Sequence, residues 1–162
     1  MDYKIEVVEL LKQPYVALDL TCSPEEFPLE VEKSLTSIWG VLDATAVPPA
    51  GPPICIVPQI TSTDDEVPPP TPWRLLVGFP VEDELIAEDP VCFGHLPGGK
   101  VLQTLHMGKL DTLSTAYLAL QVYMMKEGLT PNGVPWEVYL TDPVWEPDPE
   151  QWRTEVNWAV KG

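Results

Sequence analysis

Glu137 and Tyr139 lie in a short segment that alternates like a β-strand, with Trp136, Val138 and Leu140 on its other face. We expect the apolar set to pack against a helix layer, which leaves Glu137 and Tyr139 facing a cleft. A carboxylate in mid-strand is costly to bury unless it is paired, hydrogen-bonded or in contact with a ligand. Beside aromatic rings it can attract a delocalised organic cation by charge and by cation–π contact. The segment therefore predicts a cation-binding group.

Two alternatives bear on the role of Glu137. The first is a structural ion pair with Arg153 on a neighbouring predicted strand. The second adds Glu155 and Asn157, which join the same cleft if the apolar residues of their strand pack inward. Two carboxylates at one pocket separate into acid and base because burial and repulsion push their pKa values apart. That pair would suit addition of water to an activated ring or binding of a dication, whereas an exposed Glu155 would do neither.

Two aromatic residues on predicted helices are further candidate ligand contacts. Trp39 borders an apolar helical stripe, so it either covers the pocket or completes the core. Tyr117 has the spacing of a core residue, and its hydroxyl needs a partner if it is buried. His106 is interpreted as a structural hydrogen-bonding residue. No metal-ligand spacing and no nucleotide, zinc-hydrolase or serine-hydrolase motif occurs, so we expect neither a metal nor a cofactor.

The elements that must position these residues recur in the two halves of the chain. Segments 73–81 and 152–160 both begin with Trp-Arg, carry aromatic residues and valines at matching places, and alternate like strands. Each half reads strand, helix, strand, strand: 15–21, 25–42, 53–57 and 73–81 in the first, and 101–106, 111–127, 135–140 and 152–160 in the second. Residue His95 falls in an expected loop before the second half.

This order predicts an α+β fold formed by tandem duplication of a strand-helix-strand-strand unit. We place the pseudo-repeats at about residues 3–85 and 97–161 of a single domain that spans residues 1–162. One helix covers only one face of each small sheet. Two such units side by side would form curved antiparallel sheets around a ligand cleft at their junction.

Six groups of residues then show a family resemblance. They are Pro97-Gly98-Gly99-Lys100-Val101, His106-x-Gly108-x-x-Asp111-x-Leu113, Ala116-Tyr117, Gly128-Leu129, the run 135–143 and Trp152-Arg153-Thr154-Glu155-Val156. On these, the C-terminal half resembles the GyrI-like effector-binding domain, which also occurs in AraC- and MerR-type regulators. The chain departs from the pattern at Gly108-Lys109-Leu110, where such domains often carry Gly-Pro-Tyr, and in proline-rich insertions at 47–53 and 67–72, which are placed to reshape the mouth of the cleft.

The resemblance implies an aromatic pocket with a carboxylate at its floor that accepts amphipathic, often cationic, aromatic molecules. The leading hypothesis is therefore binding or sequestration of a drug or toxin through Glu137, Tyr139, Trp39, Asn157 and Tyr117. The alternative is a hydrolase that detoxifies strained cyclopropanoid DNA-alkylating natural products, with Glu137, Glu155 and Tyr139 as catalytic residues. Inhibition of gyrase is a weaker alternative, and the sequence leaves open whether the protein is an enzyme.

Charge and composition narrow the range of partners. The 162 residues carry 25 acidic against 9 basic side chains, a net charge of −16, which disfavours direct contact with nucleic acid and attracts organic cations. The sequence has no apolar run of signal-peptide or membrane-spanning length, so we expect a cytoplasmic protein without membrane contact. Three widely spaced cysteines are interpreted as buried thiols. The expected ligand is a lipophilic or cationic small molecule, and no protein partner is indicated.

Overall fold

The computed structural model describes residues 3–84 and 90–162. Its strands are β1 (Glu6–Leu10), β2 (Gln13–Cys22), β3 (Ile54–Ile56), β4 (Trp73–Pro80), β5 (Val91–Leu96), β6 (Gly99–Met107), β7 (Thr130–Pro131), β8 (Trp136–Tyr139) and β9 (Arg153–Lys161). Its α-helices are α1 (Phe27–Ala44) and α2 (Ser114–Glu127), with short 3-10 turns at Leu110–Thr112 and Pro149–Gln151. Within this part of the chain, neither helix is both long and apolar enough to cross a membrane.

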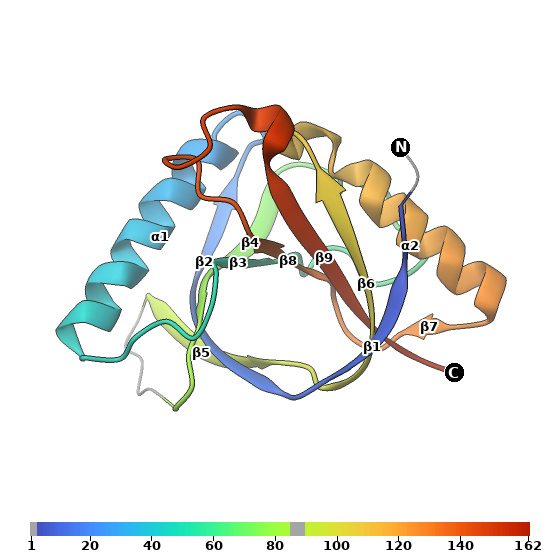
Figure 1. The fold of residues 1–162 in the computed structure, drawn as a ribbon, viewed down its shortest axis with the longest axis horizontal. Coiled ribbons are helices and arrows are strands. Elements are labelled where there is room, and N and C mark those ends of the chain that lie inside the picture. Colours follow the sequence, from blue (N-terminus) through green and yellow to red (C-terminus); the bar gives the residue numbers. More distant parts are fainter. Residues whose placement is uncertain (1–2, 85–89) are drawn as a thin grey trace.

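The strands form a curved, unclosed antiparallel sheet in the order β1-β6-β9-β8-β3-β4-β2-β5, with β7 paired to β9 (Figure 1). Two successive units, β2-α1-β3-β4 and β6-α2-β8-β9, meet where β3 pairs with β8. The predicted α+β class and the strand-helix-strand-strand order are confirmed. Sequence patterns missed β1, β5 and β7, and His95 lies in β5 rather than in a loop.

The helices begin and end where local chemistry allows. Helix α1 starts with a proline in its first turn, where a missing N–H costs no hydrogen bond. Helix α2 ends at Gly128, whose φ of 69° is the left-handed conformation that glycine adopts most readily.

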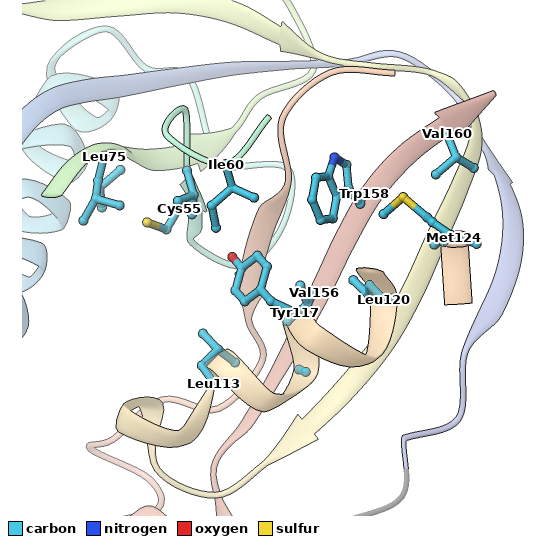
Figure 2. Close-up of a cluster of buried hydrophobic side chains, with 14 of the residues drawn as sticks. Cys55, Ile60, Leu75, Leu113, Tyr117, Leu120, Met124, Val156, Trp158 and Val160 are labelled. Atoms are coloured by element: carbon cyan, nitrogen blue, oxygen red, sulfur yellow. The ribbon is translucent and has the colours of Figure 1, made fainter. Parts of the chain in front are cut away.

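Both helices pack on the same face of the sheet, which we call the helix face. In an antiparallel pair, residues directly opposite each other point to the same side, and the register aligns Val156, Glu137, Cys55 and Val77 across four strands. This row belongs to the helix face. Figure 2 shows the core built there, with Leu113 just before α2 and Tyr117 and Leu120 of α2 packed against side chains of the sheet and of the segment after β3: Cys55, Ile60, Val156 and Trp158.

The other face of the sheet, which we call the inner face, carries a core of its own because the sheet curls around it (Figure 1). Its buried residues come from both edges and the centre of the sheet: Ile54, Ile56, Leu96, Val101, Trp136 and Ala159. The prediction that Trp136, Val138 and Leu140 pack against a helix layer is therefore wrong. Trp136 and Val138 pack on the inner face, and Leu140 is 45% exposed just beyond β8.

The tight pairing of β2 with β4 gives a stability test. At Gly78, an added Cβ would lie 1.8 Å from the carbonyl oxygen of Val16, so backbone would have to move. We expect Gly78→Ala to lower the free energy of unfolding by about 3 kcal/mol. In the matched variant Gly40→Ala on α1 the new methyl meets no atom within 4 Å, and we expect a gain of about 0.5–1 kcal/mol. Urea unfolding measures both, and equal effects would contradict the packing described.

Candidate ligand-binding site

A cavity of about 110 Å³ lies on the helix face at the junction of the two units, between the first turns of α1 and α2. Cys55, Leu75 and Glu137 from the sheet form its floor. Its walls come from the start of α1, from the 3-10 turn and the start of α2, and from the segment that leads into β4: Phe27, Leu110, Asp111, Leu113, Ser114, Tyr117, Val67, Pro68, Pro69 and Trp73. The lining is largely apolar and aromatic, which suits a lipophilic ligand.

Glu137 is the buried acidic group of this cavity, with only 6% of the residue exposed. Tyr117 on α2 donates a hydrogen bond to its Oε2 at 2.6 Å, and Tyr139 on the same strand donates to its Oε1 at 2.9 Å. Burial raises the pKa of Glu137, and the two tyrosine hydrogen bonds act in the opposite direction. Each oxygen of the carboxylate is therefore held by one hydroxyl, and the net pKa lies above its usual range.

The two tyrosines remain hydrogen-bond donors over the physiological range. Burial is the largest cause that raises the pKa of Tyr117 and of Tyr139 well above the usual value, and the neighbouring acidic groups Cys55 and Glu137 raise it further. Burial likewise raises the pKa of the Cys55 thiol, which lies directly opposite Glu137 on β3. A buried thiol of raised pKa is a poor nucleophile, so Cys55 serves as a small apolar part of the floor.

Glu137 has no cationic partner among the described residues. The predicted alternative of an ion pair with Arg153 is wrong, because Arg153 is exposed and lies on the other face of the sheet. Two neutral donors stabilise a carboxylate but leave its charge uncompensated. A positively charged ligand in the cavity would supply the missing compensation.

Glu155 and Asn157 lie away from the cavity. The register places Val156 opposite Glu137 and Glu155 opposite Val138, so Glu155 and Asn157 are on the inner face. There they form a separate polar chain, in which Asn157 Nδ2 donates to Glu155 Oε1 at 3.0 Å and Gln103 donates to Asn157 Oδ1 at 2.9 Å. The expectation that they share a cleft with Glu137 is wrong, because the cavity is on the helix face.

Trp39 also lies outside the cavity lining. The residue is 55% exposed and its ring packs edge-on against Phe79, with centroids 5.7 Å apart. Its neighbour Ile38 occupies the buried stripe of α1 instead. Tyr117, by contrast, combines both roles considered for it, since it belongs to the core and donates to Glu137.

Sequence reasoning missed several residues of the cavity. Trp73 lines the cavity with Phe27, and the two rings meet edge-on with centroids 5.7 Å apart. Pro68 and Pro69 fall in the insertion expected to reshape the cleft mouth, and they do form part of its wall. The signal for Cys55 was its place in the strand that pairs with the strand of Glu137.

His106 has the structural role expected of it. Its ring is buried, Nε2 lies 2.9 Å from the carbonyl oxygen of Lys109, and Nδ1 lies 2.7 Å from the hydroxyl of Tyr3. Because the carbonyl can only accept, Nε2 carries the proton and Nδ1 accepts from Tyr3. This network fixes the turn that leads into α2.

A sequence model of the GyrI-like small molecule binding domain matches residues 3–161. The chain belongs to this family. No curated protein matches this GyrI-like domain. Its fold is similar to the C-terminal domain of EcmrR, with a TM-score of 0.75 and 19% identity over 99% of each chain. It is also similar to the EcmrR chain of an EcmrR–DNA complex, with a TM-score of 0.78 and 19% identity. That match includes 98% of this chain but only 57% of the longer EcmrR chain.

Two further solved structures resemble this GyrI-like domain in fold. SAV2435 bound to tetraphenylphosphonium has a TM-score of 0.60 at 11% identity, covering 100% of this chain and 95% of that one. A hydrolase from Listeria innocua has a TM-score of 0.59 at 14% identity, covering 98% and 92%. At these identities the likeness shows a shared fold, and the site must be argued from this domain's own residues.

The raised pKa of Glu137 gives a prediction for stability. A carboxyl whose pKa is higher in the folded state contributes stability that is complete below the unfolded pKa and lost as pH rises through the folded pKa. Glu137→Gln removes this loss, so we expect it to raise the melting temperature by a few degrees at about pH 8, with a gain that shrinks towards about pH 4. Thermal unfolding over this range, with Glu32→Gln on the exposed side of α1 as control, measures the effect. An equal gain in melting temperature at the two ends of this pH range would contradict the prediction.

Proposed function

We propose that this GyrI-like domain binds a lipophilic, aromatic organic cation in the cavity, with Glu137 as the counter-charge, and so sequesters a drug or toxin. The observation that carries the proposal is a buried carboxylate without a cationic partner among the described residues, placed in a largely apolar cavity whose lining also includes the exposed residue Asp111. Burying a charge in this way is unfavourable unless something compensates it. An organic cation does so while its hydrocarbon part fills the apolar space.

The surroundings of Glu137 favour this class of ligand. The rings of Phe27, Trp73 and Tyr117 line the cavity, and aromatic faces attract organic cations. The net charge of −16 raises the local concentration of cations and works against contact with a phosphate backbone. SAV2435, which shares the fold, is seen bound to a lipophilic cation, tetraphenylphosphonium. These points support a small molecule as the partner of this domain.

Tyr117 and Tyr139 orient the carboxylate for this role. Their hydroxyls bond to different oxygens of Glu137, so the carboxylate plane is fixed before a ligand arrives. A preorganised group loses less entropy when it binds. The tyrosines also reduce the cost of keeping the carboxylate ionised inside the fold.

A hydrolase is the second candidate, and the raised pKa of Glu137 is the observation that favours it. A buried carboxyl of raised pKa can act as general acid or base, with Tyr139 donating a hydrogen bond to the reacting group. Glu155 cannot share this chemistry, because it lies on the opposite face. Product formed catalytically from a cyclopropanoid alkylating compound, and abolished by Glu137→Gln, would support this candidate. Recovery of intact compound after long incubation would reject it.

The charge of the ligand can be tested with two molecules of the same shape. We expect Glu137→Gln to weaken the binding of N-methylquinolinium at least about tenfold, or about 1.4 kcal/mol. The affinity for its neutral isostere, a methylnaphthalene, should stay nearly unchanged. In the wild type, affinity for the cation should fall as the solution is acidified through the raised pKa of Glu137, because the protonated carboxyl has no charge to offer.

Isothermal titration calorimetry measures both ligands against the wild type and the variants. Glu155→Gln is the matched control, since it removes the same charge from the opposite face of the sheet, and we expect it to change neither affinity. Equal weakening of the cation and the isostere by Glu137→Gln would rule out Glu137 as the counter-charge.

A further inference from the structure

The segment between β3 and β4 forms one wall of the cavity. We call residues 61–72 the strap. Val67, Pro68 and Pro69 of the strap line the cavity, across from the first turn of α2. The width of the cavity therefore depends on where the strap is held, as well as on the two helices and the sheet.

The C-terminal end of the strap is fixed by side chains that flank it. Gln59 donates from Nε2 to the carbonyl oxygens of Pro70 and Pro72, at 3.3 and 3.2 Å, and its Oε1 accepts from the backbone N–H of Arg74 at 2.9 Å. The indole of Trp73 donates to the carbonyl oxygen of Pro69 at 2.9 Å. These bonds hold the proline run against the start of β4.

The N-terminal end of the strap is fixed to α2. Gln121 is buried, and its Nε2 donates to the carbonyl oxygens of Ser62 at 3.3 Å and Asp65 at 3.1 Å. The carboxylate of Asp65 in turn accepts the backbone N–H groups of Thr61 and Ser62, which closes a tight turn. Because prolines restrict the backbone between the two fixed ends, the strap is a stiff wall.

The space that this wall leaves is small. A buried water needs roughly 10–15 Å³ of cavity volume. The cavity of about 110 Å³ therefore holds on the order of ten water-sized groups. One aromatic ring or two fused rings with a cationic nitrogen fill that space. The four phenyl rings of tetraphenylphosphonium exceed that space, so the whole molecule enters only if the strap moves, and movement would break the strap's bonds to Gln59, Trp73 or Gln121.

We propose that the strap, held by Gln59 and Gln121, is the specificity-determining element of the site and restricts it to small planar cations of one or two fused rings. This proposal rests on the proposed function, since it assumes that the cavity binds a cation. It adds an upper limit on ligand size, set by the strap and by two glutamines that hold it without lining the cavity themselves.

The test compares two cations of the same charge and different size. In the wild type we expect N-methylquinolinium to bind at least about thirtyfold more tightly than tetraphenylphosphonium. Gln59→Leu, alone and combined with Gln121→Leu, removes bonds to the strap without altering a lining residue. We expect either change to lower the ratio of the dissociation constant of tetraphenylphosphonium to that of N-methylquinolinium by about tenfold. The ratio should fall mainly because tetraphenylphosphonium binds more tightly.

Gln13→Leu is the matched control. Gln13 also donates to two backbone carbonyls, those of Pro14 and Val81, but it lies on β2 away from the strap. We expect it to leave the ratio unchanged. Circular dichroism and thermal unfolding check that each variant folds, and if the glutamine variants do not, the ratio between the two cations in the wild type still tests the size limit.

The two proposals fail in different ways. A wild-type ratio near one, or a ratio that the strap variants leave unchanged, would overturn the size limit while the role of Glu137 stands. Equal affinity of the wild type for N-methylquinolinium and its neutral isostere would overturn the charge argument, yet the ratio between the two cations would still report on the strap.

Discussion

One unfavourable feature constrains the rest of the structure: a carboxylate is buried where the two units meet. Glu137 has 6% of its surface exposed, and its two oxygens are held by Tyr117 and Tyr139. A hydrogen-bonded carboxylate is tolerated in an interior, but its charge still raises the free energy of the folded state. The surrounding fold must therefore be stable enough without it. Large apolar cores on both faces of the sheet supply that stability.

The curl of the sheet explains why a cavity forms on the helix face. Because the inner face buries Trp136 and its neighbours within the curl, neither helix is needed to cover it. Both helices are then free to pack on the other face, α1 over β2 and β4 and α2 over β6 and β9. The short strands β3 and β8 lie between these two pairs of strands in the sheet (Figure 1). The site therefore lies where the two units meet, with Cys55 and Glu137 side by side on its floor.

Sequence patterns predicted the order of elements and the central residues of the site, because periodicity is a local property. Alternation in β8 paired Glu137 with Tyr139, and helical spacing placed Tyr117 in the core. Alternation defines two faces without saying which one a helix will cover. The interpretation therefore placed Trp136 against the helices and Glu155 beside Glu137, and both were wrong. The strap was out of reach for another reason: its position depends on hydrogen bonds to Gln121, far along the chain.

Helix α2 connects the charged floor of the cavity to its wall. Tyr117 and Gln121 are four residues apart, so they project from the same side of the helix. The first donates to Glu137 and the second to the strap carbonyls of Ser62 and Asp65. A ligand large enough to displace the strap would pull on the same two turns of α2 that orient the carboxylate. If both proposals hold, charge recognition and the size limit are joined through one helix, and a ligand that exceeds the size limit would also disturb the tyrosine that orients its counter-charge.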